Sequence, residues 1–178
     1  MAIHRFSMIF DGLKKELGED EARRIFPEYS SLPDESRKMS AKEQFELAHS
    51  IMERMDHSLE REQIKKIRHS HVCNLTRAQV REFIELKERC ESLDELLTAC
   101  GCIKQGDGAY LLRWDNDKCV CGLCRNLDAY EPISKTWCEC CNGHVIKSYS
   151  WVCGLPISSE FVETYASGGK SYSFKLSV

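Results

Sequence analysis

The run Cys119-Val-Cys-Gly-Leu-Cys124, followed after thirteen residues by Cys138-Glu-Cys-Cys141, holds six of the eleven cysteines of the chain. It contains two Cys-x2-Cys pairs and two Cys-x-Cys pairs. Thiolates at such spacings suit a tetrahedral soft-metal site. The sequence therefore predicts a metal-stapled region, with zinc as the first candidate and an iron–sulfur cluster as the less favoured one.

Two sets of four ligands fit this run. One has the spacing of a zinc ribbon: Cys121, Cys124, Cys138 and Cys141. The other uses the Cys-x-Cys pairs: Cys119, Cys121, Cys138 and Cys140. The second set is reasonable if its first pair lies on a strand, which directs both side chains to one face, and its second pair stands just before a helix. The alternative without metal is a group of reduced cysteines that serve as small apolar side chains.

The composition is that of a soluble globular protein. The chain has 178 residues, 42% hydrophobic and 30% charged, with a net charge of -3. No basic face is apparent, which argues against nucleic-acid binding. No apolar run resembles a signal peptide or a membrane span. We therefore expect no membrane association and a cytoplasmic location, where thiols stay reduced.

Residues 1–103 show helical periodicity. Apolar residues recur every three or four positions in 3–17 and in 45–55. Three residues suit the N-cap position of further helices: Ser40, with Glu43 as its capping-box partner, Thr76 and Ser92. We expect a helical region, which could also provide the interface of a homodimer.

Residues 104–178 combine strands with one helix. Strands are predicted at 110–114, 118–122, 157–166 and 172–178, with a turn at 115–117. A helix near 142–153 should end at Gly154, which can adopt the left-handed conformation. The predicted fold class is α+β, with a helical N-terminal half packed on a C-terminal antiparallel sheet that has one inserted helix. The two parts should form one compact domain.

Two residues outside the cysteine run are candidates for acid–base chemistry. His144 follows the second cysteine group and, in the first turn of a helix, could bind a metal, a carboxylate or an anion. Glu163 lies between Phe161 and Tyr165, and burial would raise its pKa and suit it to general acid or base catalysis. For both residues the simpler expectation is an exposed side chain.

Two other clusters contain metal-binding residue types. His69-Ser-His71-Val-Cys73 lies in the helical part, without a second group of ligands nearby in the sequence. Cys100-Gly-Cys102 lies where the two parts meet and could be redox-active, although the apolar residues around it indicate a buried seam. Both signals are weaker than that of the main run.

Three segments carry a resemblance to known proteins. They are Lys118-Cys-Val-Cys-Gly-Leu-Cys-Arg125, Thr136-Trp-Cys-Glu-Cys-Cys-Asn-Gly-His144, and Gly154-Leu-Pro-Ile157 with the later Glu163-Thr164, Gly168-Gly169 and Phe174-Lys-Leu176. In these segments the chain resembles cysteine-rich domains grouped around 4-vinyl reductase-type, methanogen output and L-2-amino-thiazoline-4-carboxylic acid hydrolase-like proteins.

The resemblance implies an α+β sheet domain that encloses a small-molecule pocket and often holds a metal. It favours Cys-x-Cys in both groups, which implies four ligands, with Cys124 and Cys141 as alternates: Cys119, Cys121, Cys138 and Cys140. The last strand of these proteins usually carries a cysteine where this chain has Tyr172. Chemistry that depends on that cysteine is therefore not implied here.

Three functions compete on this basis. The first is a small-molecule-binding or sensing protein with a structural metal site, because four cysteine ligands leave no position for a catalytic water. The second is a hydrolase acting on a small cyclic or sulfur-containing substrate, with Cys124 or Cys141 as nucleophile and His144 or Glu163 as base. The third is a thiol-redox or metal-handling protein, whose cysteines form reversible disulfides.

Overall fold

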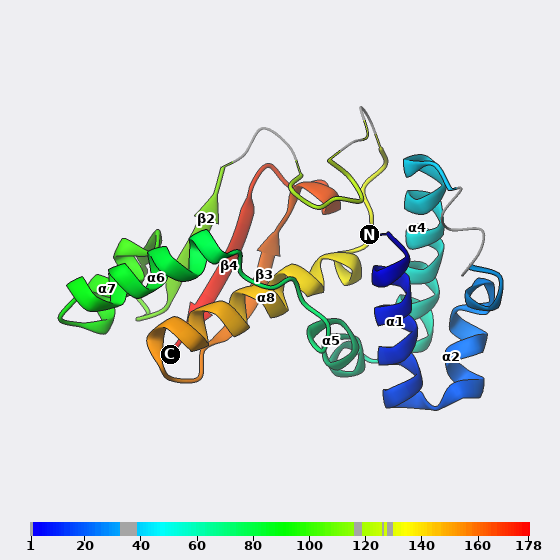
Figure 1. Ribbon diagram of the computed structural model, residues 1–178, viewed down its shortest axis with the longest axis horizontal. Coiled ribbons are helices and arrows are strands. Elements are labelled where there is room, and N and C mark those ends of the chain that lie inside the picture. The colour runs from blue at the N-terminus through cyan, green and yellow to red at the C-terminus, as the bar shows by residue number, and fades with distance from the viewer. Residues whose placement is uncertain (1, 33–38, 116–118, 126, 128–129) are drawn as a thin grey trace.

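The fold is organised around one long helix. A computed structural model describes residues 2–32, 39–115, 119–125, 127 and 130–178. Helix α8 (Lys135–Cys153) crosses the molecule, and the other elements gather around its two ends (Figure 1). Near its start lie α1 (Ala2–Leu17), α2 (Glu19–Ile25), the 3-10 helix η1 (Pro27–Ser30) and α4 (Ala41–Ser58). Toward its end lie α6 (Arg77–Arg89) and α7 (Leu93–Ala99), and α5 (Arg61–His69) packs across it. None of the helices described combines the length and the apolar composition that a membrane span needs.

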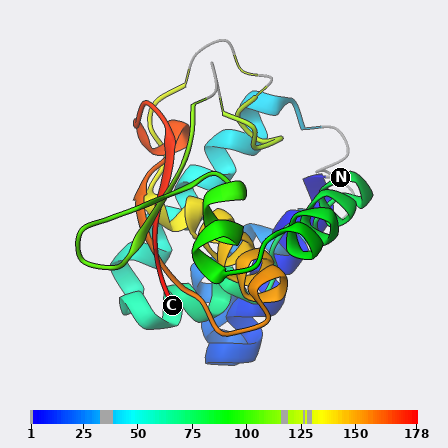
Figure 2. The ribbon, with the colours of Figure 1, turned by 90° about the vertical axis from the view of Figure 1, so that its left-hand side faces the viewer.

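The sheet has four antiparallel strands in the order β1-β2-β4-β3. They are β1 (Cys102–Lys104), β2 (Tyr110–Trp114), β3 (Ser158–Glu163) and β4 (Tyr172–Ser177), with the 3-10 helix η2 (Tyr165–Ser167) between the last two. Helix α8 is inserted between β2 and β3 and lies between the sheet and α6 (Figure 2). The predicted α+β class, with a C-terminal sheet and one inserted helix, is confirmed.

Alternation along the strands determines which face of the sheet is buried. Tyr110 and Leu112 on β2, and Phe174 and Leu176 on β4, point to the same face and are 4% exposed or less. Burying one such side chain contributes about 1.5–3 kcal/mol. The other face is more open, since Ile103 is 59% exposed.

Local capping signals place several helices where the sequence predicts them. Ser40 and Glu43 form the capping box of α4, with the backbone N–H of Ser40 donating to the Glu43 carboxylate at 2.6 Å. Thr76 and Ser92 are the N-caps of α6 and α7. The predicted apolar stripe of α4 is buried: Phe45, Ala48, Ile51, Met52 and Met55.

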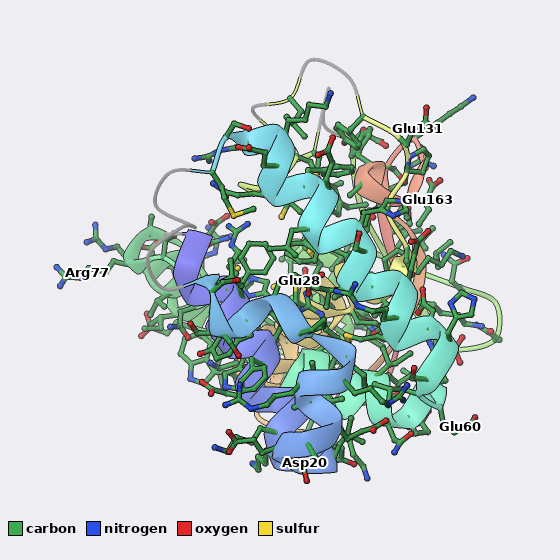
Figure 3. The ribbon with its side chains drawn as sticks, turned by 90° about the vertical axis from the view of Figure 1, so that its right-hand side faces the viewer. Asp20, Glu28, Glu60, Arg77, Glu131 and Glu163 are labelled. Carbon is green, nitrogen blue, oxygen red and sulfur yellow. The ribbon has the colours of Figure 1, made fainter. Side chains whose placement is uncertain are left out.

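The first helices form a bundle that positions the start of the chain. Phe10 of α1 stacks on Tyr29, with 3.8 Å between the ring centroids. Arg54 of α4 donates to the carbonyl of Ile25 and pairs with Glu28 at 2.8 Å. Figure 3 shows Glu28 where α2 and α4 lie side by side. These contacts connect α1, α2 and α4 beside the start of α8.

Two predictions for the cysteine run are wrong. Residues 119–125 form a turn and not a strand, because both edges of β2 are occupied, by β1 and by β4. The inserted helix begins at Lys135 and not near residue 142, so Cys138 and Cys140 lie inside it. The predicted turn at 115–117 falls mostly outside the described residues.

Candidate thiolate centre

The start of α8 positions three of the six clustered cysteines. Ser134 caps the helix by accepting a hydrogen bond from the backbone N–H of Thr136 at 3.1 Å. Asp56 of α4 accepts hydrogen bonds from the hydroxyls of both residues, each at 2.5 Å. The first turn of α8 is therefore tied to the helical bundle. Three cysteines follow in the first two turns, near the positive end of the helix dipole: Cys138, Cys140 and Cys141.

The other three cysteines lie in the turn 119–125. A backbone hydrogen bond of 3.0 Å from Cys124 to the carbonyl of Cys121 closes this turn. Tyr172 of β4 holds its start, because the tyrosine oxygen accepts one backbone N–H of the loop at 3.1 Å and lies 2.9 Å from Cys119 Sγ. The residue at which the chain departs from the resemblance thus anchors the loop to the sheet.

The two groups of thiols lie close enough to interact electrostatically. The Cys124 thiol faces the sulfurs of Cys119 and Cys121 within hydrogen-bonding reach and has one proton to share between them. Cys138 interacts electrostatically with both of those residues, and its sulfur accepts a hydrogen bond from the Thr164 hydroxyl at 3.0 Å. We call the six thiols the thiolate centre: Cys119, Cys121, Cys124, Cys138, Cys140 and Cys141.

Two arginines bring positive charge to this centre. Arg5 of α1 donates from Nη1 to Cys121 Sγ at 3.4 Å. Gly122 leaves room for this approach, since a Cβ at that position would lie 2.9 Å from Arg5 Nη2. Arg68 of α5 is 6% exposed and acts electrostatically on Cys140. Both cations favour the thiolate form of the sulfurs that they face.

Hydrogen bonds favour the thiolate form of two loop cysteines. The hydrogen bond from Cys124, aided by Arg5, lowers the pKa of Cys121 to about 5 although burial opposes the shift. The hydrogen bonds from Cys124 and Tyr172 lower the pKa of Cys119 to about 7, again against burial. Because Cys124 shares its proton with these two sulfurs, its own pKa is raised and it keeps that proton at neutral pH.

The cysteines of α8 also comprise one with a lowered pKa and others with a raised pKa. The hydrogen bond from Cys141, together with Arg68, lowers the pKa of Cys140 to about 7 although burial opposes it. Donating that hydrogen bond raises the pKa of Cys141. Burial raises the pKa of Cys138. At neutral pH the centre therefore holds thiolates beside protonated thiols.

The donor chemistry suits a soft metal ion, although binding requires the sulfurs to move. Over the described ranges, no group of three or more His, Cys, Asp or Glu side chains is arranged so that it could hold a metal ion. Within the part of the chain that the structure describes, the indole N–H of Trp137 is buried without a conventional hydrogen-bond partner, and it favours the thiolate of Cys121. Thiolate sulfurs with N–H and guanidinium donors around them are the surroundings that a metal–thiolate site needs.

The acid–base candidates lie apart from these contacts. His144 is in the third turn of α8 and not in the first, and its Nδ1 lies 2.6 Å from the carbonyl oxygen of Cys73. Glu163 accepts hydrogen bonds from the Ser171 hydroxyl at 2.5 Å and from the backbone N–H of Lys170. These hydrogen bonds lower its pKa, whereas burial would have raised it. Figure 3 shows Glu163 near the edge of the molecule.

Two pockets among the described residues lie away from the cysteines. A pocket of 350 Å³ lies over the open face of the sheet and is lined by Gln105, Gly106, Asp107, Leu111, Val162 and Lys175. A second, of 270 Å³, lies between α1 and α5 and is lined by Gly12, Lys15, Glu16, Lys66, Ile67 and Ser70. Neither lining includes a cysteine.

Helix α5 supplies site residues that sequence reasoning missed. Arg68 donates to the carbonyls of Thr136 and Trp137, at 3.2 and 2.8 Å, and lies 5.0 Å from the Trp137 ring centroid. It thus fixes the first turn of α8 and brings charge to the centre. The capping box of Glu60 and Gln63 was the local signal for this helix.

Glu139, between two cysteines of the centre, is fully buried. It pairs with Arg61 and with His69, whose Nε2 lies 2.8 Å away, and accepts a hydrogen bond from Asn142. Burial would raise the pKa of this carboxyl, but His69, Asn142 and Arg61 together lower it. Of the predicted cluster around His71, His69 thus pairs with a carboxylate, while His71 meets the Ser70 hydroxyl at 2.8 Å.

A second thiol group lies at the other end of α8. It comprises Cys100 at the end of α7, Cys102 on β1 and Cys153, the last residue of α8. Burial raises the pKa of Cys100 to about 12 and that of Cys102 to about 11, although the nearby Tyr149 hydroxyl, which donates to the Cys100 carbonyl at 2.9 Å, favours the Cys102 thiolate. Burial also raises the pKa of Cys153. All eleven cysteines of the chain are free thiols.

The chain belongs to a family of unknown function, DUF6144, whose sequence model matches residues 3–175. Comparisons with curated proteins and with solved structures found no match.

Proposed function

We propose that this member of the DUF6144 family binds one soft metal ion, with zinc as the first candidate, at a structural site in the thiolate centre. The four proposed ligands are Cys119, Cys121, Cys124 and Cys138. The observation that carries the proposal is the network in which the Cys124 thiol joins two other loop sulfurs beside the buried Cys138.

This set differs from the one favoured by the resemblance, because Cys124 replaces Cys140. Residues two apart on a helix point about 160° away from each other, so Cys138 and Cys140 present different faces of α8. Cys124 instead lies within hydrogen-bonding reach of both other loop sulfurs. Exchanging the proton of Cys124 for a metal would keep the three loop sulfurs together, although the four ligands must still move into a tetrahedral arrangement.

The proposed role is structural because four cysteine ligands close a tetrahedral zinc site. The ion would join the turn 119–125, which has no strand partners, to the start of α8. Four thiolates around a divalent ion leave two negative charges. Arg5 and Arg68 lie where they can balance them.

A thiol-redox function is the second candidate. Cys121 and Cys124 form a Cys-x2-Cys pair in which one sulfur is a thiolate and its neighbour keeps its proton. A thiolate of this kind is the nucleophile of disulfide exchange. Small-molecule sensing and hydrolysis remain predictions, because, among the described residues, the two pockets named above are not lined by cysteines and His144 and Glu163 bond elsewhere.

The deciding experiment measures metal content and native mass on protein purified without a metal-binding tag. The expected result is one zinc ion per chain, lost in Cys124→Ser and Cys138→Ser. Cys140→Ser and the distant control Cys153→Ser should keep it. Visible absorbance with bound iron would point instead to an iron–sulfur cluster. Metal-free protein that forms a reversible Cys121–Cys124 disulfide would replace the proposal with the redox function.

A further inference from the structure

The segment between α5 and α6, residues 70–75, lies along the face of α8 that continues from Cys140. His144 Nδ1 meets the carbonyl oxygen of Cys73 at 2.6 Å, and Lys147 donates to the side chain of Asn74 at 3.1 Å. Positions 140, 144 and 147 follow one another along one face of a helix. We call residues 70–75 the strap.

A glycine in α8 permits the close approach of the strap. A Cβ at Gly143 would lie 2.7 Å from Val72 Cγ1 and 2.9 Å from the Cα of His69. Any larger residue would push the strap away from the helix. The position of Cys73 is therefore determined by the α8 face that also carries Cys140.

The strap adds a seventh thiol to the surroundings of the thiolate centre. Cys73 is exposed, and the charged groups that act on it are Cys140, Arg5, Cys121 and Arg68. Cys140 and Cys121 are partly exposed, whereas three proposed ligands are buried: Cys119, Cys124 and Cys138. Sulfurs thus extend from the surface to the interior.

We propose that Cys73 and Cys140 are a capture pair, which receives a soft metal ion from a low-molecular-weight thiol complex and passes it to the buried ligands. This inference rests on the proposed function. Metal–sulfur bonds to the pair form as those to the donor break. Cys121 and the buried cysteines then displace the pair. Thiol protons leave to the solvent, and no oxidation state changes. An accessible pair helps because three of the four proposed ligands are only 1–2% exposed, and the fourth, Cys121, is only partly exposed.

The test measures metal transfer rates by stopped flow. Zinc would be supplied as its glutathione complex, and release would be followed with a chromogenic chelator. Cys73→Ser should slow uptake and release by about tenfold each, which leaves the equilibrium affinity unchanged. His144→Ala, which keeps every thiol but frees the strap, should slow both rates by a smaller factor. Cys90→Ser is the matched control and should match the wild-type protein.

Each other outcome overturns the inference. Equal rates in Cys73→Ser and wild type would show that the strap thiol has no part in transfer. A loss of affinity as large as that of Cys138→Ser would make Cys73 a permanent ligand. Wild-type protein that takes up no zinc would overturn both proposals. Normal stoichiometry with unchanged rates would overturn only the capture pair.

Discussion

The two ends of α8 both gather cysteines, yet they favour opposite protonation states. At its start, hydrogen bonds from neighbouring thiols and the charges of Arg5 and Arg68 lower the pKa of three cysteines to between about 5 and 7. At its end, burial dominates and raises the pKa of Cys100 and Cys102 to about 12 and about 11. The helix dipole reinforces this difference, because its positive end favours thiolates at the start of α8 and its negative end disfavours them near Cys153. Clustering alone therefore does not make cysteines reactive, because their surroundings decide whether they are thiolates.

Metal removal should separate the two ends most strongly. At free zinc about 1,000 times the Kd, binding stabilises the folded chain by about 4 kcal/mol. A chelator should lower the free energy of unfolding by that amount in wild type and in Cys153→Ser. It should have no effect in Cys138→Ser. Guanidinium titrations with and without chelator measure this, and a chelator effect that persists in Cys138→Ser would place the metal elsewhere.

The second-largest expected difference is in how much the charged pairs near the two ends of α8 contribute to stability. Glu139→Gln leaves Arg61 and His69 without their buried carboxylate and should cost about 2 kcal/mol, less than a fully buried pair because Arg61 is 45% exposed. Lys104→Gln, in an exposed pair with Asp94 near the other end, should change stability much less. Urea denaturation compares them, and equal effects would contradict the assignment of a buried charge network to the start of α8.

Alkylation of the metal-free protein should also distinguish the ends. At pH 7 the pKa values give Cys121 a thiolate fraction about 10⁴ times that of Cys102, while its lower basicity reduces its intrinsic reactivity by roughly 10³. Cys121 should therefore react with iodoacetamide at least about tenfold faster. Peptide mass spectrometry gives both rates in one sample. If Cys102 were labelled before Cys121, the proposed difference in thiolate character between the two ends of α8 would be wrong.

The smallest expected effect is the change in thiol pKa when a single nearby cation, Arg5 or Lys87, is removed. Arg5→Gln removes a charge that favours the Cys121 thiolate, so the midpoint of its alkylation profile should rise from about 5 toward about 6. Lys87→Gln, the counterpart near Cys153, should raise the pKa of that thiol in the same direction but change its slow alkylation little. A profile of Cys121 that Arg5→Gln leaves in place would show that the thiol hydrogen bond acts alone.

The part of the fold encoded in local signals could be predicted from the sequence. The capping box of Ser40 and Glu43 and the alternation that ends at Leu176 depend only on near neighbours, and both features appear where expected. The strand expected at 118–122 fails for a non-local reason. Its alternation fits a strand, but β4 and β1 already occupy both edges of β2.

The candidate site also has a part that local sequence signals predict and a part that depends on residues distant in the sequence. Cysteine spacing was enough to predict that the two groups lie near each other, because both lie in one short stretch, and they are close enough to interact electrostatically. Arg5, Arg68 and Cys73 were not predicted as parts of the site, since they come from helices or connections far away in the sequence. The spacing left two sets of four ligands open, and only the resemblance favoured Cys140 over Cys124. The set with Cys140 assumed a strand where the chain turns and an extended segment where it is already helical.

Gly143 lowers the intrinsic stability of α8 but allows the strap to pack closely against the helix. In the interior of a helix, glycine is less favourable than alanine by about 0.8–1.0 kcal/mol. A peptide spanning residues 135–153 should therefore become more helical on Gly143→Ala. In the folded protein the new methyl group would meet Val72 at 2.7 Å, so the same change should weaken the contact between α8 and the strap. A change that makes the helix more stable by itself would thus displace the strap, and with it the exposed thiol of Cys73, from α8.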